Sequence, residues 1–121
     1  ITPIEARIER FVDLSKDFIG RDAVVARSKE PLPMVLVYCE VDTKDTECRG
    51  NEPVYLKDEL VGITTSGTWS HTSDKSLAFA YVNPELEEAG SRFDIRVMGE
   101  RCSAKVLEAP AVDPRNAKLK V

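Results

Sequence analysis

The middle of the chain reads Glu52-Pro-Val-Tyr-Leu-Lys-Asp-Glu-Leu-Val-Gly-Ile-Thr-Thr-Ser-Gly-Thr-Trp-Ser-His71, and Leu77-Ala-Phe-Ala-Tyr-Val82 follows shortly after. Short runs rich in β-branched and aromatic residues alternate here with turn residues, a pattern typical of strands joined by tight turns. Lys57-Asp58-Glu59 is one turn candidate. Gly62, inside the second run, predicts a bulge or tight bend of the kind found at barrel corners.

Further strands are predicted on both sides of this stretch. Met34–Val41 is a dense apolar run typical of a buried strand, and Phe93–Val97 alternates apolar and polar residues at period two. Met98-Gly99-Glu100 provides a hairpin turn, after which Arg101–Leu107 returns as another strand. Several short strands joined by turns predict a mainly β fold, a small antiparallel, Greek-key-like β-barrel.

The first part of the chain has a different character. Ile8–Leu14 alternates loosely and predicts a short strand, whereas Arg21–Lys29 has a helical pattern that Pro31 and Pro33 end. We therefore predict a linker with one short helix over residues 1–31, a C-terminal barrel domain over residues 32–110 and a tail over residues 111–121.

Composition excludes several classes of protein. With 121 residues the chain fits one domain, and it contains no apolar run of the ~18 residues that a membrane-spanning helix needs. A net charge of −4 without a basic stripe argues against a nucleic-acid partner. The first residue is Ile1, with neither an initiator methionine nor a signal peptide. We expect a piece of a longer polypeptide.

The three cysteines do not form a recognisable framework. Cys39, Cys48 and Cys102 are odd in number and lack paired metal-ligand spacing, so neither disulfides nor a metal site is expected. Cys39 and Cys102 lie in predicted strands and should be buried. Cys48, beside Arg49 in a polar loop, has two interpretations: a reactive thiol of lowered pKa or an ordinary exposed thiol. Reduced thiols favour a cytoplasmic location, or the mitochondrial matrix in a eukaryote.

Three blocks carry a family resemblance. They are Thr2–Ala6 with Phe11-Val12 and Lys16–Ala23; Gly50–Ser70; and Leu77–Val82 with the turn at Gly99 and Ala109-Pro110. In this order they resemble the C-terminal barrel of the glycine cleavage T-protein (aminomethyltransferase) family. Arg10-Phe11 and Ala109–Asn116 are more similar to the T-protein-like halves of dimethylglycine and sarcosine dehydrogenases, which we favour as the parent.

The resemblance implies a one-carbon function. Family members transfer a one-carbon unit to tetrahydrofolate with an aspartate of their first domain, and no residue here matches it. The chain would then be an accessory scaffold, inactive alone, that packs on the catalytic domains of its parent and closes one side of the folate channel. A dehydrogenase parent would carry FAD in an upstream domain. Two alternatives stay open: a stand-alone, non-catalytic interaction barrel that no longer binds folate, and a small enzyme using His71 and Cys48.

The resemblance also implies five candidate cofactor-binding residues, and no catalytic or metal-binding ones. Glu5 and Phe11 would lie near the folate channel, with Phe11 stacked on folate or packed on the barrel. Trp69 would contact the aminobenzoate part or simply cover the barrel end. His71 would donate to a carboxylate or be an exposed loop residue, and Arg115 would bind the glutamate tail or lie in a frayed tail.

Two positions depart from the family pattern. Arg7 stands where the family usually has glycine, so we expect a different backbone there. His71 stands where proline is usual, which leaves open the conformation of a predicted loop over Ser66–Ser73.

Overall fold

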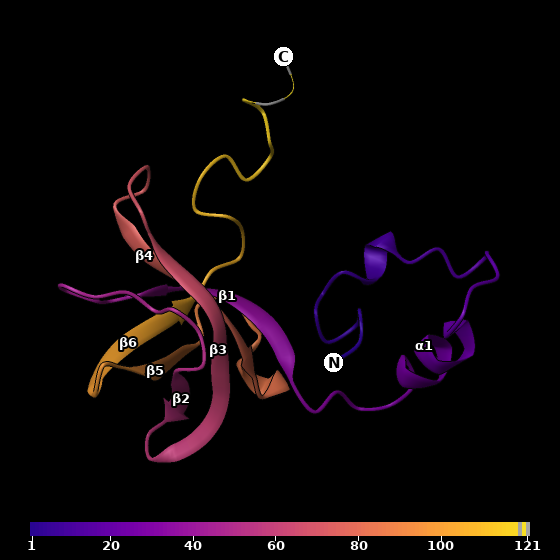
Figure 1. The fold of residues 1–121 in the computed structure, drawn as a ribbon, viewed down its shortest axis with the longest axis horizontal. Coiled ribbons are helices and arrows are strands. Elements are labelled where there is room, and N and C mark those ends of the chain that lie inside the picture. The colour runs from indigo at the N-terminus through magenta and orange to yellow at the C-terminus, as the bar shows by residue number, and fades with distance from the viewer. Residues whose placement is uncertain (119, 121) are drawn as a thin grey trace.

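The computed structural model describes residues 1–118 and 120 of the chain. It contains six strands, one α-helix and two short 3-10 helices (Figure 1). In chain order these are η1 (Glu9–Phe11), α1 (Arg21–Arg27), β1 (Val35–Val41), β2 (Pro53–Leu56), β3 (Glu59–Ser70), β4 (Lys75–Val82), η2 (Pro84–Leu86), β5 (Arg92–Val97) and β6 (Glu100–Val106). No helix of the described part is long and apolar enough to cross a membrane.

The six strands close into a barrel in the order β1-β4-β3-β2-β5-β6. All neighbouring strands are antiparallel, and β6 returns to β1 through pairs such as Cys39 with Val106. β1 therefore lies between two strands that are distant in sequence, and the predicted mainly β, antiparallel barrel is confirmed. The pairing of β6 with β1 over Cys39–Val41 closes the sheet and covers the edge that an open sheet would expose there.

The core of the barrel is built from alternate residues of its strands. In β1 every second residue from Val35 to Val41 is buried, as period-two side-chain alternation requires. Phe93 and Ile95 of β5 are buried in the same core. Burying one valine or isoleucine side chain fully stabilises the folded state by about 1.5–3 kcal/mol relative to leaving it exposed. The barrel thus has a core of its own.

β3 has an irregular register at Gly62 and extends further than the sequence predicted. A register shift opposite Val54 and Tyr55 lies beside Gly62, so the predicted irregularity is confirmed. A Cβ on Gly62 would lie 2.3 Å from the carbonyl oxygen of Tyr81, which explains why glycine is needed. The prediction of a loop over Ser66–Ser73 is wrong, because β3 continues to Ser70 in register with the start of β4.

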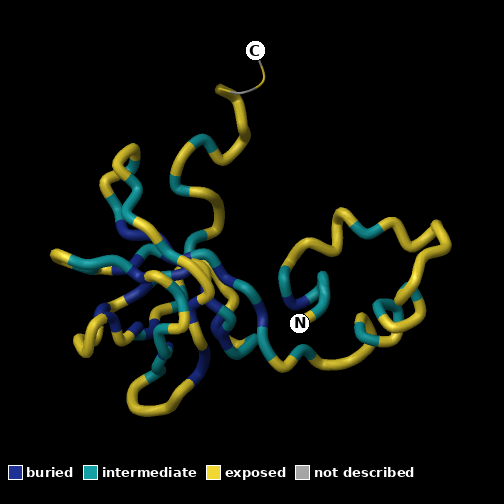
Figure 2. Tube along the Cα trace, viewed as in Figure 1, coloured by how far each residue is buried: buried dark blue, intermediate teal, exposed yellow. Residues whose placement is uncertain are grey.

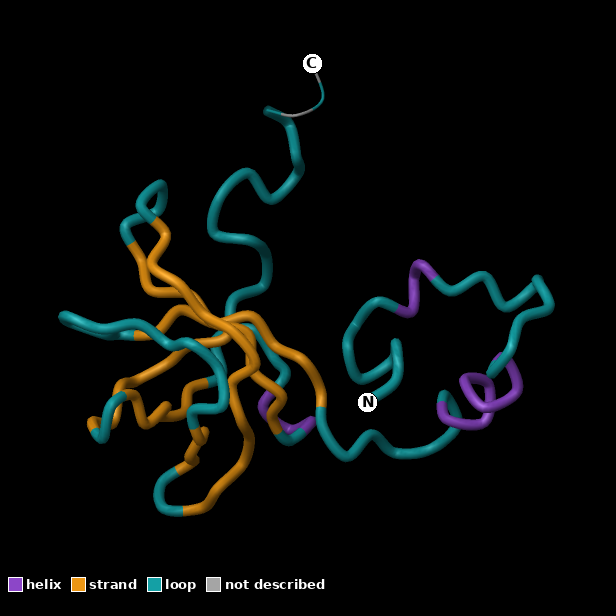
Figure 3. The backbone as a smooth tube through the Cα atoms, in the orientation of Figure 1, coloured by secondary structure: helices purple, strands orange, loops and turns teal. Residues whose placement is uncertain are grey.

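Residues 1–34, which we call the lead-in, run outward from the barrel and return to it as an open arc (Figures 2 and 3). The predicted helix is confirmed as α1. The predicted strand over Ile8–Leu14 is wrong, since η1 occupies part of it and no neighbouring strand is there to pair with. The lead-in reaches the barrel where the Leu36 N–H donates to the Glu5 carbonyl oxygen at 2.8 Å and where Arg7 pairs with Glu87.

Candidate functional site

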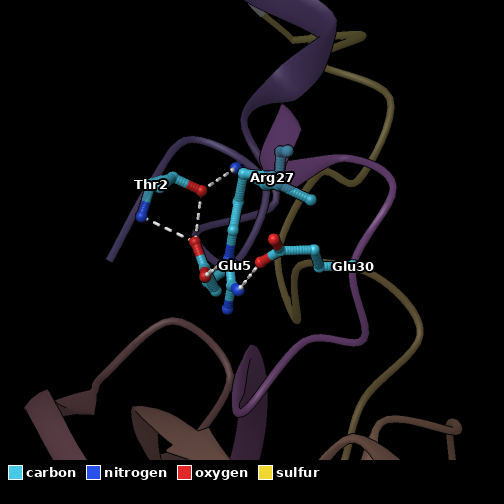
Figure 4. Close-up of polar contacts among 5 residues, drawn as sticks. Thr2, Glu5, Arg27 and Glu30 are labelled. Atoms are coloured by element: carbon cyan, nitrogen blue, oxygen red, sulfur yellow. Dashed lines mark hydrogen bonds and ion pairs between the residues drawn. The ribbon is translucent and has the colours of Figure 1, made fainter. Parts of the chain in front are cut away.

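A buried carboxylate organises the start of the lead-in (Figure 4). Glu5 is 2% exposed, and its Oε2 accepts hydrogen bonds from the Thr2 hydroxyl and from the Thr2 backbone N–H, the latter at 2.6 Å. Arg27 of α1 donates from Nε to Oε1 at 2.7 Å, and its other arm reaches Glu30 at 3.0 Å. One acidic residue therefore connects the chain start, the helix and, through its carbonyl oxygen, β1.

These contacts stabilise the ionised form of Glu5. The Thr2 hydroxyl hydrogen bond is the largest influence and, with the Thr2 N–H and Arg27, it outweighs burial and lowers the pKa of Glu5 to about 2. The carboxylate stays charged at neutral pH, and both oxygens already have donors from the chain itself. Glu5 thus fixes the shape of the lead-in here, while its assignment to a folate site stays a prediction.

Phe11 lies in η1 and is 73% exposed. The prediction that it packs onto the barrel is wrong, because the lead-in stands away from the barrel at this point (Figure 2). Its one aromatic interaction is with Arg10, whose guanidinium carbon lies 4.6 Å from the ring centroid. The ring is therefore accessible, and stacking on folate stays a prediction.

The other three candidates lie on different parts of the barrel and tail. Trp69 is half-buried near the end of β3 and lines a cavity of about 310 Å³. Its backbone N–H donates to the Glu47 carboxylate at 2.6 Å. His71 is exposed in the turn after β3, and Arg115 is exposed in the tail. Within residues 1–118 and 120, no hydrogen bond or ion pair joins any two of the five candidates.

Cys48 differs from both of its sequence interpretations. It is 0% exposed, and burial, reinforced by the nearby Glu52 carboxylate, raises its pKa to about 12. It is therefore neither an exposed thiol nor an activated one, because its loop folds over β3 at Gly67. Cys39 and Cys102 are buried as predicted, and burial raises the pKa of both thiols. All three are free thiols.

Two arginines of the lead-in have structural roles: sequence reasoning missed Arg27, whereas it singled out Arg7 because the family usually has glycine there. Arg27 is 22 residues from its partner Glu5, so no local pattern indicates the pair. Arg7 has a φ of +57°, a left-handed conformation that glycine adopts without steric cost. Among the described residues, no group of three or more His, Cys, Asp or Glu side chains is arranged to hold a metal ion.

A closed six-stranded antiparallel barrel, preceded by a lead-in with one short helix, defines a small β-barrel domain. The family model for the glycine cleavage T-protein C-terminal barrel domain matches residues 35–113. The chain belongs to this family.

Known relatives agree with this membership. Mouse mitochondrial dimethylglycine dehydrogenase is 40% identical over 97% of this chain, and an aminomethyltransferase from Natranaerobius thermophilus is 32% identical over 91% of it. The crystal structure of the Bartonella henselae glycine cleavage system aminomethyltransferase T superposes with a TM-score of 0.84 at 21% identity over 94% of this chain, and so supports the fold. The chain spans 14% of the mouse relative, 30% of the N. thermophilus relative and 33% of the B. henselae chain.

Proposed function

We propose that this chain is the accessory barrel of a tetrahydrofolate-dependent one-carbon transfer protein, where it closes one side of the folate channel. One observation carries the proposal: the family match covers the barrel, while the chain spans only 14–30% of relatives named as dehydrogenases and aminomethyltransferases. In this view the reacting groups belong to catalytic domains of the same polypeptide, on which the barrel packs. The isolated chain then has no turnover.

A dimethylglycine dehydrogenase-like parent is favoured over a free-standing aminomethyltransferase. The mouse, rat and human dimethylglycine dehydrogenases are 36–40% identical to this chain, and five matching aminomethyltransferases are 32–36% identical. Such a parent would hold FAD in an upstream domain and would act in the mitochondrial matrix of a eukaryote or in the bacterial cytoplasm. This chain supplies neither the flavin site nor the catalytic acid.

Within the chain, Phe11 is the residue best suited to contact folate. Its ring is exposed, and Glu5 and Arg27 hold the lead-in that carries it in a defined conformation. An aromatic face in that position can stack on a pterin or aminobenzoate ring. Trp69 and His71 on the barrel, and Arg115 in the tail, would contribute at the edge of the channel.

Titration calorimetry with tetrahydrofolate tests the proposal. The chain alone should give no measurable heat, whereas the complete polypeptide should bind. In the complete polypeptide, Phe11→Ala should weaken binding about tenfold or more, which corresponds to losing ~1.4 kcal/mol of stacking. Met98→Ala, which truncates an equally exposed side chain in the turn between β5 and β6, should leave affinity unchanged. Sub-micromolar binding by the chain alone would overturn the scaffold role.

A further inference from the structure

We infer that the lead-in is the last segment of the folding unit that precedes the barrel, and that its apolar side chains pack against polypeptide N-terminal to Ile1. This inference rests on the proposed function, because it requires a longer parent. It goes further by naming the docking surface and the part of the protein that covers it.

The lead-in exposes apolar side chains out of proportion to its length. Within residues 1–34 Glu5 is the one buried residue, and neither η1 nor α1 contains a buried side chain. Among the residues that the structure describes, eleven large apolar ones are exposed, and six of these lie in the lead-in, namely Ile1, Ile8, Phe11, Leu14, Phe18 and Ile19. Figure 2 shows the lead-in as mostly exposed or half-buried. Its apolar side chains therefore have no core within the lead-in to pack into.

Such a segment cannot hold its shape unaided. Ordering the backbone costs about 1–2 kcal/mol per residue. A helix of seven residues, the length of α1, is too short to be stable in water on its own. The apolar burial that normally offsets these costs is missing from the lead-in. Contact with another body must supply it.

The polar contacts of the lead-in nevertheless define one conformation. Thr2 and Arg27 close around the Glu5 carboxylate, joining residues 22 positions apart. A flexible tether has no need for a buried ion pair, and burying one costs free energy unless its hydrogen bonds are satisfied. The pair therefore marks the lead-in as part of a packed structure with a specific shape.

The barrel does not provide the missing partner. Phe11 is 73% exposed, and Ile19 is fully exposed, although the barrel is present. Leu32, just before β1, packs against the barrel core. The contacts made by the start of the lead-in are polar: the Leu36 N–H with the Glu5 carbonyl oxygen, and Arg7 with Glu87. These contacts leave most of the apolar side chains from Ile8 to Ile19 exposed.

The comparisons indicate what covers them. The family model of the barrel begins at residue 35, whereas the match to the mouse relative takes in 97% of the chain and so extends through most of the lead-in. That relative is about seven times as long as this chain, since the chain makes up 14% of it. Sequence similar to the lead-in, which lies outside the region matched by the barrel model, thus occurs in a much longer polypeptide. We assign the part of the parent polypeptide that precedes the lead-in as the surface that covers its apolar side chains.

Hydrogen exchange of the chain alone and of the complete polypeptide tests this directly. In the chain alone, amides of η1 and α1 should exchange rapidly while those of β1 and β4 stay protected. In the complete polypeptide the same lead-in amides should slow by about a hundredfold or more, as expected for buried secondary structure. Equal exchange of the lead-in in both proteins would overturn the inference.

Surface variants provide a second, independent test. Ile8→Ser and Ile19→Ser should leave the melting temperature of the chain within ~1 °C. Each should lower that of the complete polypeptide by about 3 °C or more. Met98→Ser is the matched control, with an 88% exposed side chain on the barrel, and it should be neutral in both proteins. Small, equal shifts in both proteins would contradict the inference.

Two further outcomes separate this inference from its alternatives. If hydrogen exchange of the lead-in amides slows as the concentration of the chain alone is raised, the apolar surface binds a second copy of the chain. That result would overturn the inference. A reading frame that starts near Ile1 would overturn it together with the proposed function. If the complete polypeptide fails to bind tetrahydrofolate but the isoleucine variants destabilise it selectively, the proposed function fails and this inference stands.

Discussion

Gly67 of β3 lies so close to Cys48 that a Cβ added at Gly67 would be 2.6 Å from the Cys48 Cβ and 2.7 Å from its carbonyl oxygen. Because one of the two atoms is backbone, the contact cannot be relieved by a rotamer change. Gly67→Ala should therefore destabilise the barrel by about 1–3 kcal/mol in urea unfolding. Ser66→Ala, an exposed neighbour on the same strand, should change stability by less than ~0.5 kcal/mol. A neutral Gly67→Ala would mean that the loop does not pack here.

The buried thiols should be inert in the folded chain. Burial raises the pKa of both Cys39 and Cys48 to about 12, so at pH 8 each carries roughly a thousandfold less thiolate than an ordinary cysteine. A disulfide reagent such as DTNB should react with them over hours in native buffer and within minutes in guanidinium chloride. Rapid native labelling of Cys48 would contradict its burial.

The Glu5 cluster should persist well into the acid range. Because the folded pKa of Glu5, about 2, lies below the ordinary value of 4.5, the contribution of its contacts is present above pH 4.5 and is lost as the pH falls through about 2. In the complete polypeptide, where we infer that the lead-in is packed, a carbon-detected NMR titration of the Glu5 carboxyl should give a midpoint near 2.

Removing the Thr2 hydroxyl should raise the titration midpoint of Glu5. Thr2→Ala deletes the hydroxyl that is the largest cause of the lowered Glu5 pKa, so the midpoint should rise toward 4.5. Thr72→Ala, in the exposed turn after β3, is the control and should leave it unchanged. A Glu5 midpoint near 4.5 in the unmodified complete polypeptide would show that the cluster does not form.

The turn between β5 and β6 offers a test of backbone geometry alone. Met98 and Gly99 have φ values of +50° and +89°, the pattern of a type I′ hairpin turn. No atom lies within 4 Å of a Cβ added at Gly99, so Gly99→Ala should cost about 1–2 kcal/mol through backbone strain alone. Met98→Asn, which tolerates positive φ, should stabilise the chain by about 0.5–1 kcal/mol in thermal unfolding. A stabilising Gly99→Ala or a destabilising Met98→Asn would refute this turn assignment.

The strands predicted from the sequence are those whose signal is local. The period-two alternation of Phe93–Val97 is visible without knowledge of the partner strand, and β5 buries every second residue. The dense apolar run of Met34–Val41 predicts a strand as well, although the structure buries only alternate residues of β1. The extension of β3 through Ser66–Ser70 is different, because serine, glycine and threonine carry no apolar signal there. Pairing with β4 forms that part of the strand, and pairing is a tertiary property.

The candidate site was harder to predict for the same reason. The Glu5 contact with Arg27 and the Glu47 contact with Trp69 each join residues 22 positions apart, and Cys48 is buried by a loop whose composition is polar. The sequence identified Phe11 and Trp69 through family resemblance and not through any chemical pattern of their own. The groups that would complete a folate channel belong, in our proposal, to another part of the polypeptide.

The most direct test of the account is to measure one-carbon transfer to tetrahydrofolate by the chain alone and by the complete polypeptide from which it comes. We predict methylenetetrahydrofolate formation by the complete polypeptide and none above background by the chain, at equal molar concentration. Turnover by the purified chain, abolished by His71→Ala, would contradict the assignment of this barrel as an accessory domain.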